Sequence, residues 1–173
     1  HTLGIVTLLF VGCAIIALGE SSLKRKQLYF VYVLTGFLMV LAAGLRDGNT
    51  VSDYRTYLDM YQYPEDAPPI EPTFTFICRL VKTVSPWPVL LFVIYASIGV
   101  TCKLVAIKRL TPLLFLTSVI YISNVYLLHD MTQIRAGVAS GIFLLAIRPL
   151  AERRIFRYTA LILLASLFHY SSL

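Results

Sequence analysis

The chain has 173 residues, of which 58% are hydrophobic and 14% are charged, and its formal net charge is +6. A soluble domain is about half apolar and about a quarter charged. The composition, with a mean hydropathy of +0.77, therefore excludes an ordinary soluble protein. The basic residues lie in short loops between apolar runs and form no continuous face, which argues against nucleic acid as a partner.

Several apolar runs are long enough, or nearly long enough, to cross a membrane as helices. They are 3–18, 28–45, 89–107, 112–128, 131–147 and 156–170. The sequence thus predicts an all-α, multi-spanning helical bundle with about six spans, forming one membrane domain over residues 1–173. Because the chain begins without methionine and stops just after an apolar run, we expect it to be a fragment of a longer protein.

Residues 46–88 form the polar loop between the second and third spans. Tyr54 and Tyr57 begin a series of tyrosines at helical spacing, which predicts a short helix with an aromatic face. The fourteen residues 71–84 reach about 21 Å as a helix, which is short of the roughly 30 Å hydrocarbon core. Their polar residues fall on one side, so we expect an amphipathic or re-entrant helix there.

The basic residues predict the orientation of the bundle. If 71–84 does not cross, three loops lie together on one side of the membrane. These loops carry Lys24, Arg25, Lys26, Lys103, Lys108, Arg109, Arg148, Arg153, Arg154 and Arg157. The asymmetry collapses if 71–84 crosses, so we expect these loops to be cytoplasmic and 46–88 to be an extracytoplasmic loop with short helices.

Arginines lie at the outer ends of two predicted spans, at Arg46 and Arg135. A charge at membrane depth is costly and usually faces a cavity, and a guanidinium group binds phosphate or carboxylate through two hydrogen bonds. Arg55 and Arg79 would extend this positive field, or contact lipid headgroups instead. For Arg135, snorkelling to the interface or pairing with an acid such as Asp130 is the structural alternative.

Three residues of the predicted outer face are candidates for acid–base chemistry. His169, near the end of the last span, can serve as a general base near neutral pH. Asp53 and Glu71 are carboxylates that offer the same chemistry. The alternatives are an interfacial histidine, helix caps and solvated loop charges.

Asp47, Tyr54 and Tyr57 are candidates for binding sugar, through a carboxylate that accepts from hydroxyl groups and through aromatic rings. A solvated charge and an interfacial aromatic belt are the alternatives. The sequence contains no His, Cys and Asp cluster at metal-ligand spacing and no Gly-rich phosphate loop followed by a helix. We therefore expect no metal and no cofactor.

Residues 137–141 surround Ser140 with small residues, and together with His169 they are similar to the Ser–His dyad of a rhomboid-type intramembrane protease. That motif requires glycine where this chain has Val138. Small residues at helix-packing spacing explain Gly137 and Gly141 more simply.

Four short motifs follow one another on the predicted outer face. They are Arg46-Asp47 with Asp53-Tyr54 and Tyr57, then Glu71-Pro72-x-Phe74, then Met131-Thr132-Gln133-Ile134-Arg135, then Phe168-His169-Tyr170-Ser171-Ser172. In order, spacing and predicted side of the membrane, they resemble the EpsG/Wzy family of bacterial polysaccharide polymerases. The motifs span 46–172, and members of that family are longer, so the chain resembles an amino-terminal portion.

The resemblance implies a GT-C-like glycosyltransferase in the bacterial inner (cytoplasmic) membrane, with its active face outward. It would join oligosaccharide repeat units carried on undecaprenyl diphosphate, beside other polysaccharide-assembly membrane proteins. The leaving diphosphate would be bound by the four arginines Arg46, Arg135, Arg55 and Arg79. The acceptor hydroxyl would lose its proton to His169, or to Asp53 or Glu71.

A non-enzymatic alternative is a flippase for lipid-linked glycans or an anion transporter. The same arginines would then line a path across the membrane. Such a path needs polar residues down to the cytoplasmic side, where the predicted spans are nearly all apolar.

Overall fold

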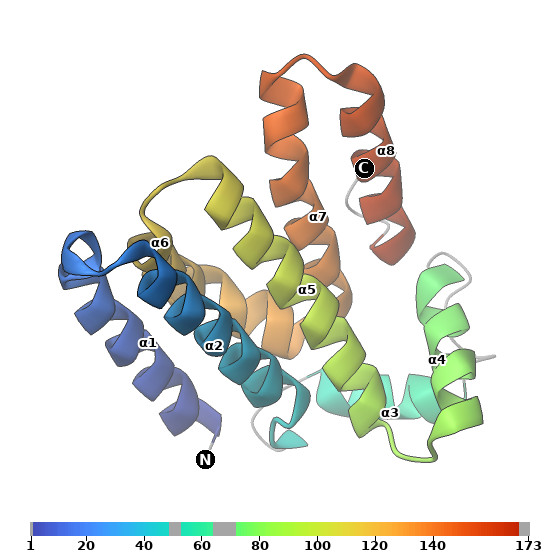
Figure 1. The fold of residues 1–173 in the computed structure, drawn as a ribbon. Helices are drawn as coiled ribbons and strands as arrows, with labels where there is room; N and C mark the ends of the chain where they lie inside the picture. The colour runs from blue at the N-terminus through green and yellow to red at the C-terminus, as the bar shows by residue number, and fades with distance from the viewer. Residues whose placement is uncertain (1, 49–52, 64–71, 170–173) are drawn as a thin grey trace.

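The computed structural model describes residues 2–48, 53–63 and 72–169, which are helical and contain no strand within those ranges (Figure 1). In chain order the elements are α1 (Thr2–Leu18), η1 (Glu20–Ser22), α2 (Arg25–Gly44), α3 (Tyr54–Gln62), α4 (Pro72–Val84), α5 (Val89–Leu110), α6 (Leu114–Tyr121), η3 (Ile122–Thr132), α7 (Ile134–Ala151) and α8 (Ile155–Phe168). The predicted all-α fold class is confirmed.

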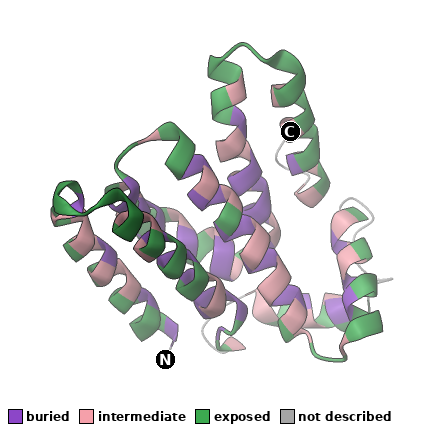
Figure 2. Ribbon diagram, viewed as in Figure 1, coloured by how far each residue is buried: buried purple, intermediate pink, exposed green. Residues whose placement is uncertain are grey.

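Four helices are long and apolar enough to cross a membrane: α2, α5, the continuous helix formed by α6 and η3, and α7. The shorter apolar helices α1 and α8 complete the multi-spanning bundle that the sequence predicts. Large hydrophobic side chains such as Leu8, Phe30 and Phe156 are exposed on its outside. Figure 2 shows exposed positions along the outer faces of α1, α2 and α8, as a surface that contacts lipid requires.

Helix α5 lies at the centre of the bundle, between α2 and α7, and α7 packs in turn on α8. The contact of α5 with α7 is close because both helices carry glycine there. A Cβ atom added at Gly141 would lie 3.0 Å from the carbonyl oxygen of Gly99. Small residues at such a crossing let helix backbones approach one another, which favours packing in a membrane.

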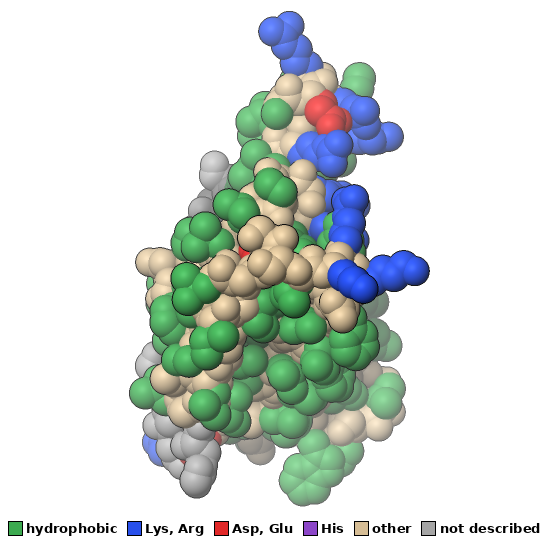
Figure 3. Space-filling model, turned by 60° about the vertical axis from the view of Figure 1, so that its left-hand side comes forward, with side chains coloured by type: hydrophobic (Ala, Val, Ile, Leu, Met, Phe, Trp, Pro, Cys, Tyr) green, Lys and Arg blue, Asp and Glu red, His purple; other side chains and the backbone are tan. Residues whose placement is uncertain are grey.

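The two ends of the bundle differ. At one end α3 lies across the bundle and α4 stands beside it, and we call this the α3–α4 end (Figure 1). The start of α1 belongs to the same end, because the backbone N–H of Asp47 donates to Oγ1 of Thr2 at 3.1 Å. The turns α1–α2, α5–α6 and α7–α8 lie at the other end, where Figure 3 shows lysine and arginine side chains, and we call it the basic end.

A buried carboxylate ties two turns of the basic end together. Glu20 accepts hydrogen bonds from the backbone N–H groups of Leu114 (2.7 Å) and Phe115 (3.2 Å). These N–H groups belong to the first turn of α6, where helical partners are lacking and the helix dipole favours negative charge. Glu20 thereby fixes the α1–α2 turn against the start of α6.

Lys103 departs from the predicted charge distribution. The sequence placed it with Lys108 and Arg109 in a cytoplasmic loop, but α5 continues to Leu110, so that Lys103 lies inside the helix and is only 2% exposed. Its ammonium group lies 2.9 Å from Oδ1 of Asp130, which is itself 2% exposed and not on the surface. The ion pair explains how both charges are tolerated inside the bundle.

Candidate functional site

An aromatic cluster joins the helices of the α3–α4 end. Its rings come from α3, α4, α5 and α8: Tyr54, Tyr57, Phe74, Phe92, Tyr95 and Phe168. Tyr54 stacks on Phe92 with ring centroids 4.8 Å apart and planes at 20°. Ring contacts of this kind stabilise packing beyond the area they bury. The cluster therefore fixes α3, which is too short to span, onto the membrane helix α5.

Arg46 lies against this cluster, two residues after the end of α2, and is 5% exposed. Its guanidinium carbon is 4.2 Å from the centroid of the Phe92 ring and 5.7 Å from that of Tyr54. Nη1 donates to the carbonyl of Ala43 at 2.6 Å. Nε and Nη2 are buried and have no hydrogen-bond acceptor among the described residues. Burial lowers the pKa of Arg46 to about 10, so the side chain still carries its charge at neutral pH.

Arg135 lies against the neighbouring rings of the same cluster. Its guanidinium carbon is 5.5 Å from the centroid of Tyr57 and 5.4 Å from that of Phe74. The chain leaves helical geometry at Gln133 and resumes it at Ile134, which places Arg135 in the first turn of α7. The positive end of a helix dipole and a guanidinium group thus occur together, a combination that favours an anion.

The end of α8 meets the same region. Phe168 packs edge to face on Tyr95, and the hydroxyl of Thr73 in α4 donates to the carbonyl of Leu167 at 2.5 Å. His169 follows directly, half-buried, with its backbone N–H bonded to the carbonyl of Ala165. The backbone of His169 is thereby held at the edge of the aromatic cluster.

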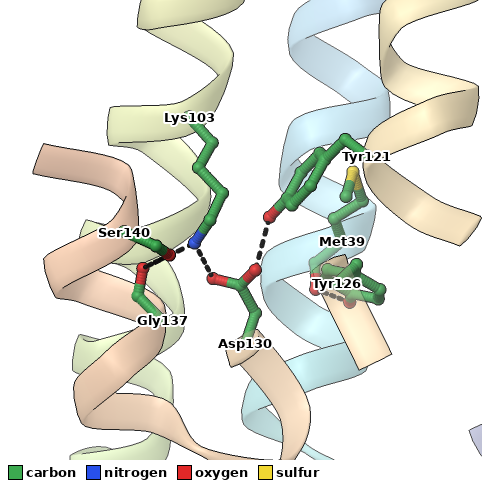
Figure 4. A network of polar contacts seen from close by, with 7 residues as sticks. All are labelled: Met39, Lys103, Tyr121, Tyr126, Asp130, Gly137 and Ser140. Carbon is green, nitrogen blue, oxygen red and sulfur yellow. Dashed lines mark hydrogen bonds and ion pairs between the residues drawn. The ribbon is translucent and has the colours of Figure 1, made fainter. Parts of the chain in front are cut away.

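A buried polar network lies behind the start of α7 (Figure 4). Lys103 donates to Asp130 and, at 2.5 Å, to the carbonyl of Gly137, while the hydroxyl of Tyr121 donates to Oδ2 of Asp130 at 2.8 Å. The hydroxyl of Ser140 donates to the same carbonyl, as small polar residues in membrane helices commonly do. The network connects α5, the end of η3 and the turn of α7 that carries Arg135.

Comparison with known proteins gives one result. The model of the EpsG family matches residues 29–173, a range that includes every predicted site residue. The chain belongs to the EpsG family. Searches of curated proteins and of solved structures each found no match. Membership of the EpsG family, together with the apolar helices, indicates a membrane protein of polysaccharide biosynthesis and suggests a polymerase.

The remaining predicted residues of this EpsG-family chain occupy different positions. Asp53 is half-buried at the start of α3, and its carbonyl accepts from the N–H of Tyr57. Asp47 is exposed beside the start of α1, and Arg55 on α3 and Arg79 on α4 are exposed at the α3–α4 end. Glu71 lies outside the described residues.

The sequence did not single out two residues of the site, Phe92 and Tyr95, which support Arg46 and Phe168. Their spacing of three at the start of α5 places them on one helix face, but an aromatic residue in an apolar run is usually explained by the core. The pairing of Lys103 with Asp130 was missed as well. The apolar run that continues past Lys103 to residue 107 was the signal that this lysine lies within a span.

Proposed function

We propose that this EpsG-family chain joins undecaprenyl-diphosphate-linked oligosaccharide repeat units on the outer face of the bacterial inner membrane. One observation carries the proposal: Arg46 and Arg135, from different spans, lie against one aromatic cluster. A buried arginine with two donors that find no acceptor among the described residues is costly unless an anion completes its hydrogen bonds. A diphosphate supplies such oxygens, and its charge increases as it leaves.

The reaction breaks the bond between the anomeric carbon of the growing chain and an oxygen of the lipid diphosphate. The diphosphate leaves with the electron pair, and Arg46 and Arg135 stabilise its charge. A hydroxyl oxygen of the next lipid-linked unit forms the new bond to the anomeric carbon. Its proton passes to His169, with Asp53 and Glu71 as the second choices.

The other candidate residues take supporting roles in this proposal. Tyr57 is only 3% exposed and lies between Phe74 and Phe92, so that its ring positions Arg135 and is not open for sugar stacking. Asp47 is exposed at the α3–α4 end, where its carboxylate would accept from glycan hydroxyl groups. Arg55 and Arg79 are exposed as well. They would attract the anionic substrate electrostatically over a distance and would not bind it directly.

The proposal is tested in the complete protein by separate Arg46→Gln, Arg135→Gln and His169→Ala substitutions. Removal of one group that stabilises developing charge is expected to slow polymerisation about a hundredfold. Single lipid-linked repeat units should accumulate, as resolved by gel electrophoresis of the glycan. Arg157→Gln removes the same charge from an exposed site at the basic end and should leave the polymer at normal length. Normal long polymer in all three variants would contradict the proposal.

A flippase or anion transporter is the second candidate, and the Lys103–Asp130 pair favours it by placing polar groups inside the bundle. The pair is, however, closed by Tyr121 and Gly137. The purified protein in vesicles distinguishes the two functions. Formation of a glycosidic bond between labelled units supports the polymerase, whereas movement of labelled units across the membrane without bond formation supports the transporter.

A further inference from the structure

Two adjoining hollows lie along the contact of α2 with α5 and reach toward the basic end. The first, of about 410 Å³, is lined by Arg25, Lys108 and Arg109 together with apolar residues around the α5–α6 turn. The second is an apolar groove of about 540 Å³ that follows α2 and α5. Tyr29 and Lys108 line both, so the two hollows adjoin at this pair of residues. We call the first hollow the cationic head and the second the apolar tail.

The cationic head gathers like charges around one ring. The Nζ of Lys108 lies 4.5 Å from the centroid of Tyr29, and the guanidinium carbon of Arg25 lies 5.7 Å from it. Arg25 also donates to the hydroxyl of Tyr29 at 3.4 Å. Neither hollow has an aspartate or glutamate in its described lining. Cations this close repel one another, and an anion between them would relieve the repulsion.

The basic residues of the α7–α8 turn provide a contrast within the same molecule. There Glu152 accepts from Arg148 at 2.7 Å and lies 3.0 Å from Arg154, and the hydrogen bond from Arg148 lowers the pKa of Glu152. That turn neutralises part of its own charge. Among its described lining residues, the cationic head between α2 and α5 has no such carboxylate. Glu20 lies behind the lining residue Leu114, and its two oxygens already accept from the backbone N–H groups of Leu114 and Phe115.

The apolar tail has the dimensions of a lipid chain. On α2 the groove extends from Tyr29 to Leu41, about 18 Å of helix, and one leaflet supplies about half of a 30 Å hydrocarbon core. The hydroxyl of Ser97, which lines the groove, donates to the carbonyl of Val93 in its own helix. Beyond Leu41 the helices close, because a Cβ added at Gly44 would lie 2.7 Å from Cγ2 of Val93.

We propose that this site binds an anionic phospholipid of the cytoplasmic leaflet. Its phosphate lies against Arg25, Lys108 and Arg109, and one acyl chain occupies the groove between α2 and α5. A basic pocket between membrane helices on the cytoplasmic side is a known setting for anionic headgroups. The cationic head begins at Arg25, at the opposite end of α2 from Arg46, so the inference does not depend on the proposed polymerase. Lipid bound there bridges α2 and α5 and stabilises the folded bundle.

The head is tested by titrating the complete protein, purified in detergent, with phosphatidylglycerol, phosphatidylcholine or inorganic phosphate. Native mass spectrometry and the thermal midpoint are the measurements. Phosphatidylglycerol should remain bound and raise Tm, while phosphatidylcholine and inorganic phosphate should not. Lys108→Gln should weaken phosphatidylglycerol binding about fivefold, as expected for one lost charge near an anionic lipid. Lys26→Gln removes a charge one residue from Arg25 but outside both hollows, and should have no such effect.

The tail is tested by Thr101→Trp, which fills the groove from an exposed position of α5. Leu34→Trp places the same side chain on an exposed part of α2 that lines neither hollow and serves as control. Loss of phosphatidylglycerol only in Thr101→Trp is expected, with Tm in the absence of lipid confirming that both variants fold. Equal binding of phosphatidylcholine, equal stabilisation by inorganic phosphate, or unchanged binding in both Lys108→Gln and Thr101→Trp would overturn the proposal.

Discussion

Tyr57 and Phe92 meet edge to face, with ring centroids 6.4 Å apart and planes at 81°. A different arginine lies against each of the two rings. Arg46 lies against Phe92 and Arg135 against Tyr57. One ring belongs to the short helix α3 and the other to the span α5. A single aromatic contact thus positions two cations that are far apart in the sequence, one just after α2 and one in the first turn of α7.

Phe92→Leu should reduce polymerisation more than it reduces stability. Leucine keeps most of the apolar volume but removes the ring that Arg46 faces and that Tyr54 stacks on. The lost cation–π interaction amounts to about 0.5–2 kcal/mol, which corresponds to an effect of about 2- to 30-fold if it acts on the bound substrate. Polymer length and Tm of the purified variant check this. Phe156→Leu, at a 94% exposed position, is the control and should change neither.

Arg46→Met should raise Tm while it slows polymerisation about a hundredfold, as expected for Arg46→Gln. The pKa of Arg46 is lower in the folded protein, at about 10, than its ordinary value of 12.5, because burial disfavours the charge. The residue is protonated in both states below pH 10, so the folded state bears a constant cost at neutral pH, which falls only as the pH rises above 10. Removing the buried charge should stabilise the fold by about 1–3 kcal/mol.

The change in Tm on adding pyrophosphate tests whether Arg46 binds an anion. It should raise Tm of the wild-type protein by completing the guanidinium hydrogen bonds, and it should have little effect on Arg46→Met. A variant that loses stability, or that responds to pyrophosphate like the wild type, would show that Arg46 serves the fold and not an anion.

Apolar periodicity predicted the bundle because membrane spans depend mainly on local composition. The tyrosine spacing of 54–61 likewise predicted the aromatic face of α3. The partners of that face were not predictable, because Phe92 is one of many apolar residues in its span and only the fold selects it. Arg46 and Arg135 were found from their charge at a span end, but the contact that places them on one cluster is tertiary.

The prediction for the charges inside the bundle was wrong for a related reason. Lys103 looked like a loop residue because an isolated lysine in a span is costly, and the compensating Asp130 is 27 residues away. The predicted end of the span that contains η3 was also wrong. Its π-helical winding, in which the N–H of Gln133 donates to the carbonyl of Leu128, carries the helix beyond the predicted end at residue 128.

Asp130→Ala should destabilise the protein strongly, by about 3–5 kcal/mol, because it leaves the charge of Lys103 buried without its partner. The double variant Lys103→Met with Asp130→Leu should recover most of that loss, since it removes both charges and keeps apolar volume. Thermal unfolding of the single and double variants in the same detergent is the measurement. A double variant as unstable as Asp130→Ala would show that the network contributes through Tyr121 and Gly137 rather than through charge balance.

Gly137→Ala should lower both Tm and polymerisation, because a Cβ there would lie 2.6 Å from the carbonyl oxygen of His129. That oxygen belongs to the backbone of η3, so the clash is relieved only if η3 and the first turn of α7 move apart. The turn that moves carries Arg135, which links packing to the site. Gly12→Ala is the matched control, since a Cβ at Gly12 has no neighbour within 4 Å among the described residues. Alanine favours helix over glycine, so this control should keep or slightly raise Tm and leave polymer length unchanged. If the two substitutions behave alike, close packing of η3 on α7 does not position Arg135.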